Sequence, residues 1–140
     1  MDRKQDIQEL VEGFKTIQRH LTSLVREASD ESITQVQWQV ILFVAGNKRS
    51  NVRDLHKALR ITSSAATQLV NTLEEKGLVF RRQHPEDGRV SLLVLSQKAE
   101  VAVRKMKQRR IRKLNSLLSK LTDEEISTYL GLHRKLIERI

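Results

Sequence analysis

LHKALRIT (55–62), SSAATQLVNTLEEKG (63–77) and LVFRRQHPEDGRVSLLVL (78–95) are the consecutive stretches that decide the fold. The first two have the apolar spacing of short helices. In the third, 79–83 and 90–95 have strand composition, and the segment between them holds the chain's only proline and supplies turn chemistry. Two short helices followed by a β-hairpin predict a winged helix-turn-helix, an arrangement that places one helix in the DNA major groove.

Local signals predict where the two short helices begin and end. Asn51 is expected to cap the first helix, with Asp54 three residues further on. The turn is 60–62, its last residue or Ser63 caps the second helix, and Gly77 ends that helix. Buried positions are expected at Leu55, Ala58 and Leu59 in the first helix and at Ala66, Leu69, Val70 and Leu73 in the second.

Four further helices are expected around this unit. A capping box at Thr34 starts a helix that stops at Gly46, Ser96 opens one that runs to about Leu121, and a capping box at Thr122 starts the last one. A long helix over 5–28 precedes them. Its apolar stripe is Ile7, Leu10, Val11, Phe14, Ile17, Leu21, Leu24, Val25 and Ala28, and that of the last helix is Ile126, Tyr129, Leu130, His133, Leu136, Ile137 and Ile140.

These stripes exceed what one small winged domain can cover. An uncovered apolar stripe marks a partner surface, and because oligomers are mostly symmetric, a two-fold homodimer is the simplest prediction. The alternative is a helical bundle within one chain. The expected division is therefore 1–33 as an N-terminal dimerisation helix, 34–96 as the winged helix-turn-helix, and 97–140 as C-terminal dimerisation helices.

Composition supports a mainly α-helical fold with a small β-hairpin. The chain has 140 residues, 39% of them hydrophobic but only 4% aromatic, so the core must consist mostly of aliphatic side chains. Cysteine is absent, which excludes disulfides, thiol catalysis and cysteine redox sensing. The charged N-terminus shows no secretory signal, and the longest apolar run, 40–45, is far shorter than a membrane span. A cytoplasmic protein without membrane contact is expected.

The net charge of +9 favours a polyanionic partner, nucleic acid first. Its distribution is uneven: 1–50 is neutral, 51–97 holds 7 basic and 5 acidic groups, and 98–140 holds 12 and 5. The densest basic run is 104–113. Its groups point in several directions around a helix, so DNA contact and a solvated face paired with acidic residues remain alternatives.

Enzyme chemistry is not indicated. The histidines His20, His56, His84 and His133 are scattered, none forms a metal-type pair four residues apart, and there is no glycine-rich phosphate loop. Neither a cofactor nor a metal site is predicted.

The second short helix suits a major-groove contact. With its apolar stripe inward, its outward face shows Ser63, Ser64, Thr67, Gln68 and Asn71. Gln and Asn can bond adenine bidentately, while Ser and Thr can bond bases or phosphates. The oriented N–H groups at the start of the helix also favour a phosphate. An ordinary solvated polar face is the alternative.

The stretch from Asp54 to Leu95 resembles the MarR family of bacterial winged-helix regulators, and the order of the flanking helices also fits. One departure is Leu95-Ser-Gln-Lys-Ala99, where the family typically has Leu-Thr-x-x-Gly; serine still caps a helix and alanine favours one. The matching elements are Asp54-Leu55, Leu59, Ile61-Thr-Ser-Ser-Ala65, Leu73-Glu-Glu-Lys-Gly-Leu-Val79, Pro85-Glu-Asp-Gly-Arg89 and Leu92-Leu-Val-Leu-Ser96.

The resemblance implies roles for particular residues. The family's base and phosphate contacts fall at the positions of Ser63, Ser64, Thr67 and Gln68, although the arginine often found near 63 or 68 is missing here. In the hairpin, Arg89 corresponds to the arginine that enters the minor groove and Asp87 to the acidic residue that holds the hairpin in shape. A solvated salt bridge between these two is the alternative. Arg81, Arg82 and His84 flank the tip within reach of phosphates.

The sequence therefore predicts a homodimeric, sequence-specific regulator of transcription that binds double-stranded DNA on a pseudo-palindromic operator. The resemblance implies mostly repression, with release by a small aromatic or acidic effector. Trp38, Phe14, Phe43 and Tyr129 could line its pocket, but core packing is the simpler interpretation of each. A basic dimer that coats DNA with little sequence preference is the alternative function.

Overall fold

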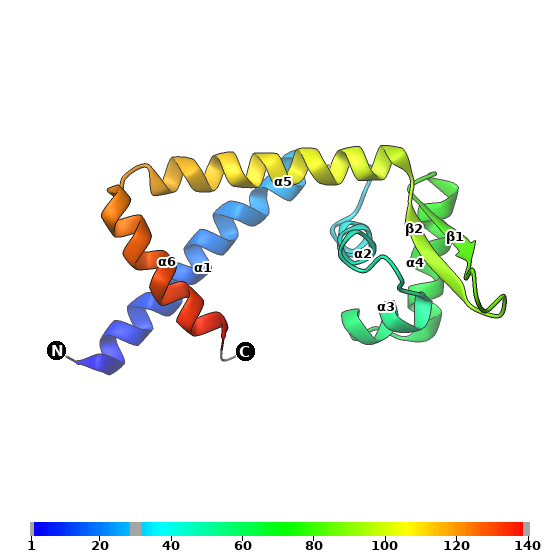
Figure 1. The fold of residues 1–140 in the computed structure, drawn as a ribbon, viewed down its shortest axis with the longest axis horizontal. Coiled ribbons are helices and arrows are strands. Elements are labelled where there is room, and N and C mark those ends of the chain that lie inside the picture. Colours follow the sequence, from blue (N-terminus) through cyan, green and yellow to red (C-terminus); the bar gives the residue numbers. More distant parts are fainter. Residues whose placement is uncertain (1, 29–31, 139–140) are drawn as a thin grey trace.

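The computed structural model describes residues 2–28 and 32–138 (Figure 1). Within that part of the chain, helices and strands follow the expected order, so the mainly α-helical fold with a small hairpin is confirmed. The elements are α1 (Arg3–Ala28), α2 (Gln35–Gly46), α3 (Val52–Leu59), α4 (Ser63–Glu75), β1 (Val79–Gln83), β2 (Ser91–Leu95), α5 (Gln97–Leu118) and α6 (Asp123–Ile137).

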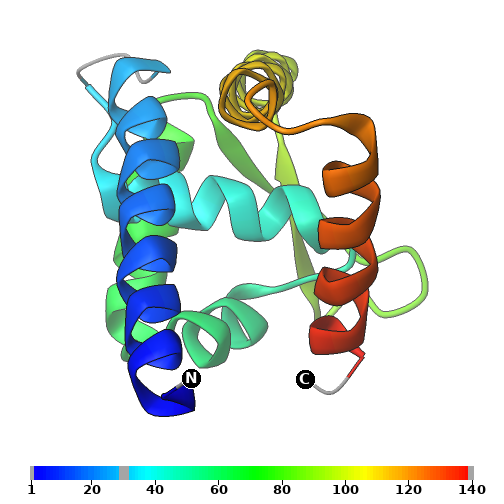
Figure 2. The ribbon, with the colours of Figure 1, turned by 90° about the vertical axis from the view of Figure 1, so that its left-hand side faces the viewer.

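Helix α5 connects two parts of the molecule. At one end it meets a lobe made by α2, α3, α4 and the hairpin, and beyond its other end the chain turns into α6 (Figure 1). Helix α1 packs against α5 and α2. Helices α1 and α6 overlap in Figure 1 but lie on opposite sides in Figure 2, so they do not cover each other.

The core lies in the lobe and holds side chains from every surrounding element. Trp38 and Ile41 of α2, Leu55 of α3, Leu73 of α4 and Leu93 of β2 are each at most 2% exposed. In α4, Ala66 and Val70 are also fully buried, as predicted, while Leu69 is half-buried against the same cluster. Burial of this face of α4 turns its opposite face outward.

The expected helix caps are present. Thr34 and Gln37 form a capping box on α2, as do Asn51 and Asp54 on α3. Thr122 and Glu125 do the same on α6. The side-chain oxygens of Thr62 and Ser96 accept N–H groups at the starts of α4 and α5, at 3.1 Å in each case. These bonds satisfy backbone donors that have no partner within the helix.

The turn after α4 fixes how the hairpin leaves the helix. Gly77 has a φ of 67°, a left-handed conformation that glycine adopts without steric cost. Its N–H donates to the Glu74 carbonyl and the Leu78 N–H donates to the Leu73 carbonyl, both at 2.9 Å. This is a Schellman motif, and its usual apolar contact is supplied by Leu73 and Leu78, both buried.

The hairpin is antiparallel, with Val79 opposite Leu95 and Gln83 opposite Ser91. Its second strand is also held to the lobe, because the Leu93 N–H donates to the Ser50 carbonyl at 2.8 Å. The tip, residues 84–90, therefore projects from an anchored base (Figure 1).

Several expected burials are wrong. Ala58 is exposed, because the neighbours of α3 cover the side that carries Leu55 and leave the side of Ala58 open. Phe14 and Tyr129, interpreted as core residues, are 50% and 47% exposed. Trp38 is in the core and Phe43 packs against it. The side chains of Leu24, Val25, Ala28 and Ile140, assigned to apolar stripes, lie outside the described residues.

The predicted stripes of α1 and α6 are not covered by the chain itself. The exposed large apolar residues include Ile7, Leu10, Val11, Phe14 and Ile17 of α1 and Tyr129, Leu130, Leu132, Leu136 and Ile137 of α6. The described part of the chain therefore does not form the closed bundle considered as an alternative. None of its helices combines the length and apolar character needed to cross a membrane.

Candidate nucleic-acid interface

The outward face of α4 carries the five predicted contact residues. Ser63, Ser64, Thr67, Gln68 and Asn71 are all exposed and, at helical spacing, share one side of the helix. The Thr67 hydroxyl donates to the Ser63 carbonyl at 2.9 Å, which leaves its oxygen free to accept. The Gln68 amide has no hydrogen bond to any described residue, so both its donor and its acceptor groups face solvent.

Arg81 ties the hairpin to α4. Its guanidinium forms an ion pair with the Glu74 carboxylate and donates to Asn71 Oδ1 at 2.9 Å. Its backbone N–H also donates to the Glu74 carboxylate, at 3.0 Å. The predicted contact residues Asn71 and Arg81 are therefore bonded to each other. This network sets the angle between hairpin and helix, and the Asn71 NH₂ group remains available to donate.

The tip of the hairpin is organised by its own side chains. Asp87 Oδ1 accepts the Arg89 N–H at 3.0 Å, and the Gln83 amide donates to the Gly88 carbonyl at 3.2 Å. His84 Nδ1 accepts the N–H groups of Glu86 and Asp87 at 3.1 and 3.2 Å. His84 is therefore a turn-forming residue, since its ring nitrogen replaces a backbone acceptor.

The predicted hairpin cations differ in their surroundings. Arg89 and Arg82 are exposed, and neither guanidinium bonds to a residue that the structure describes. No salt bridge joins Asp87 to Arg89 in that part of the chain, in contrast to the alternative considered for the tip. Arg89 thus presents a cation without a partner among the described residues, and it belongs to the hairpin tip that projects from the lobe (Figure 1).

The basic run 104–113 lies on α5, along the opposite side of the lobe from the hairpin tip (Figure 1). Apart from Arg109, its cations form no ion pair with described residues. The arrangement on α4 and the hairpin is therefore separate from the main concentration of positive charge. Nor do the described residues include a group of three or more His, Cys, Asp or Glu placed to hold a metal.

The sequence analysis missed two roles on this surface, the anchoring role of Glu74 and the turn-forming role of His84. Glu74 anchors Arg81, but the two are seven residues apart across a turn, and no sequence period links them. The turn-forming role of His84 could have been recognised. A side-chain acceptor that bonds the backbone N–H groups two and three residues further on is a familiar turn pattern.

A helix-turn-helix with an anchored, arginine-tipped hairpin defines this chain as a winged-helix protein. The model of the MarR family matches residues 32–90. The HTH-type transcriptional regulator YdgJ of Bacillus subtilis is 29% identical over 66% of this chain and 57% of its own length. The B. subtilis HTH-type transcriptional repressor YetL is 26% identical over 72% and 60%. The match therefore spans less than two thirds of either relative.

Structural similarity extends over nearly the whole chain. A MarR family protein from Bacillus stearothermophilus superposes with a TM-score of 0.82 and 25% identity, covering 99% of this chain and 98% of that one. Residues 32–90 match the MarR family, which agrees with the resemblance seen in the sequence of residues 54–95. Members of this family are transcriptional regulators rather than enzymes, in agreement with the sequence analysis.

The Arg81 network can be tested by a double-mutant cycle of Glu74→Ala and Arg81→Ala. The two side chains are only 30% and 28% exposed, so we expect a coupling of about 0.5–1 kcal/mol in the free energy of unfolding, measured with urea. The matched cycle Glu75→Ala with Arg82→Ala joins exposed residues without a mutual bond and should be additive. Additivity of the first cycle would contradict the proposed anchor.

Proposed function

We propose that this chain is a sequence-specific transcriptional regulator that binds double-stranded DNA as a homodimer on a pseudo-palindromic operator. The observation that carries the proposal is the exposed polar face of α4 beside a hairpin tipped by the unpaired Arg89. A helix of this kind fits the major groove, and the adjacent hairpin can reach the neighbouring minor groove.

Within α4 the side chains have different roles in this proposal. Gln68 contacts bases, because its unengaged amide can bond adenine at two atoms. Ser63, Ser64 and Thr67 contact bases or phosphates near the start of the helix, where backbone N–H groups also favour phosphate. Asn71 contributes as a donor while its oxygen holds Arg81.

In the hairpin, Arg89 enters the minor groove and Asp87 shapes the tip through its bond to the Arg89 N–H. A narrow, A·T-rich groove has the strong negative potential that attracts an inserted arginine. Arg82 contacts phosphate, and Arg81 acts mainly by holding the hairpin at its angle to α4.

The homodimer is supported by the apolar surface that one chain leaves open. Leu10 of α1 and Leu132 and Leu136 of α6 are 59%, 56% and 59% exposed. Exposed apolar stripes of this kind are rarely left in water, and a two-fold partner would bury them on both chains at once. Helices α1, α5 and α6 are therefore assigned to dimerisation, and residues 34–96 to DNA binding.

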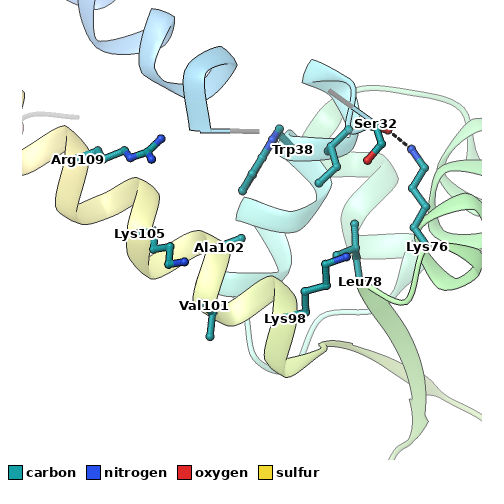
Figure 3. A pocket seen from close by; sticks show the side chains of 10 residues that line it. Ser32, Trp38, Lys76, Leu78, Lys98, Val101, Ala102, Lys105 and Arg109 are labelled. Atoms are coloured by element: carbon teal, nitrogen blue, oxygen red, sulfur yellow. Dashed lines mark hydrogen bonds between the residues drawn. The ribbon is translucent and has the colours of Figure 1, made fainter. Parts of the chain in front are cut away.

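We further propose repression that is relieved by a small aromatic or acidic effector. YetL, one of the similar proteins, is named a repressor. Between α2, α5 and the turn after α4 lies a cavity of about 380 Å³, a size that suits a small ligand (Figure 3). It joins apolar side chains, Trp38 and Leu78 among them, to the cations Lys76, Lys98 and Lys105.

One observation favours the alternative, a protein that coats DNA with little sequence preference. The outward face of α4 has no cation, while the net charge of the chain is +9. Attraction through charge alone acts on any DNA sequence.

Binding to two DNAs separates these functions. The chain is titrated against the intergenic DNA upstream of its own gene and a shuffled control, at several salt concentrations. We expect a preference of roughly a thousandfold, and Gln68→Ala should reduce that preference more than it reduces binding to the control. Equal binding of the wild type to both DNAs with a steep salt dependence would support the coating function. Equal losses of affinity for both DNAs in Gln68→Ala would make Gln68 a phosphate contact.

Arg89→Ala tests the hairpin. Operator affinity should fall about tenfold or more, because an inserted arginine contributes a few kcal/mol of contact energy. Lys120→Ala, an exposed cation in the connection between α5 and α6, is the charge-matched control and should have little effect. Unchanged affinity of the Arg89 variant would contradict the role assigned to the hairpin.

Sedimentation tests the dimer. The wild type should sediment at twice the chain mass of 16.2 kDa, and Leu10→Asp should shift it toward the monomer because a charge would be buried. Gln5→Asp adds the same charge on the opposite side of α1 and should leave the dimer intact. A monomeric wild type would contradict the dimer proposal.

A further inference from the structure

Lys76 joins the end of α4 to the start of α2. It is the C-cap of α4, and its ammonium donates to Gln37 Oε1 at 2.9 Å. The same ammonium donates to the Ser32 carbonyl (Figure 3). Ser32 lies in the connection from α1 to α2, and Gln37 lies in the first turn of α2. One side chain thus links the proposed DNA-contacting helix to the connection that leads to α1.

The acceptor on α2 has a second structural role. Gln37 is only 7% exposed, and its Oε1 also accepts the Thr34 N–H at 3.1 Å in the capping box of α2. The Lys76 bond therefore ends on a side chain that is itself held in place. Lys76 is therefore in direct contact with both the end of α4 and the start of α2.

Lys76 and Ser32 also line the cavity described above. Both acceptors of the ammonium are neutral, and a carboxylate in the cavity would accept a hydrogen bond from it more strongly. Trp38 also lines the cavity, and Lys98 and Lys105 add two further cations to its wall. The cavity therefore offers donors and positive charge to a ligand that carries acceptors.

We infer that Lys76 is the residue through which occupancy of this cavity changes the position of α4. An aromatic carboxylate in the cavity takes the ammonium from the Ser32 carbonyl and the Gln37 amide, and so releases the end of α4 from α2. The inference rests on the proposed function, in which α4 contacts DNA. Because the ligand favours the released state and DNA the tied one, each weakens the binding of the other by the same factor.

Benzoate is the probe, with benzyl alcohol as its neutral analogue. Trp38, the chain's only tryptophan, reports occupancy of the cavity by its fluorescence without DNA. Hydrogen exchange at the Gly77 and Leu78 amides reports release of the α4 end, since both form the turn that follows Lys76. In the wild type, benzoate but not benzyl alcohol should quench Trp38, speed exchange at both amides and lower operator affinity about tenfold.

Two variants of cavity cations are compared. Lys98→Met removes charge but leaves the Lys76 bonds, so benzoate should bind more weakly yet produce the full loss of operator affinity at saturation. Lys76→Met should still show Trp38 quenching through Lys98 and Lys105, but operator affinity and exchange should no longer respond. A full response at saturation in Lys76→Met would overturn the inference.

Gln37→Glu provides a test that keeps Lys76. Glutamate also serves in the capping box, and its carboxylate should hold the ammonium against the ligand, so the benzoate concentration needed for half release should rise about tenfold. An unchanged concentration would overturn the inference.

The DNA-free readouts separate this inference from the proposed function. Benzoate could speed exchange at Gly77 and Leu78 in the wild type but not in Lys76→Met, while the chain shows no specific DNA binding. That result would support the role of Lys76 and contradict the proposed regulator. Specific DNA binding without Trp38 quenching, or without any change in exchange, would leave the regulator standing and overturn the role of Lys76.

Discussion

The turn at Lys76, Gly77 and Leu78 is the constraint on which the relative position of α4 and the hairpin depends. The left-handed Gly77 lets two backbone bonds close the end of α4, while Leu78 is carried into the core beside Leu73. The direction in which β1 departs is thereby set within three residues. Arg81 then fixes the hairpin to α4 through Glu74, so helix and hairpin form one rigid unit.

The excess positive charge and the polar face of α4 lie in different parts of the molecule. The excess of positive charge lies after residue 97, mainly along α5, whereas the outward face of α4 carries hydroxyls and amides. Long-range attraction to a polyanion arises from the whole chain, but discrimination between sequences needs directional donors and acceptors. Among the described residues the Gln68 amide and the Arg89 guanidinium have no hydrogen-bond partner, and we propose that they make such contacts.

The same turn links this surface to the remainder of the chain. Lys76 connects it to the start of α2, and α2 follows directly from the segment that leads to α1. Since α1 and α6 carry apolar surface that one chain leaves open, the spacing of two lobes would depend on how these helices meet in a dimer. The cavity beside Lys76 lies between α2, α5 and the turn after α4.

The sequence alone determined the features that depend on neighbours three or four residues away. The capping boxes at Thr34 and Asn51, the glycine that ends α4 and the turn at the hairpin tip all follow from local hydrogen bonding. Only the tertiary structure decided the contacts between distant positions. Lys76 meets Gln37 from 39 residues away, and Ala58 is exposed although its spacing suits a buried face. Periodicity shows which residues share a side of a helix, but the packing of the other elements decides which side is covered.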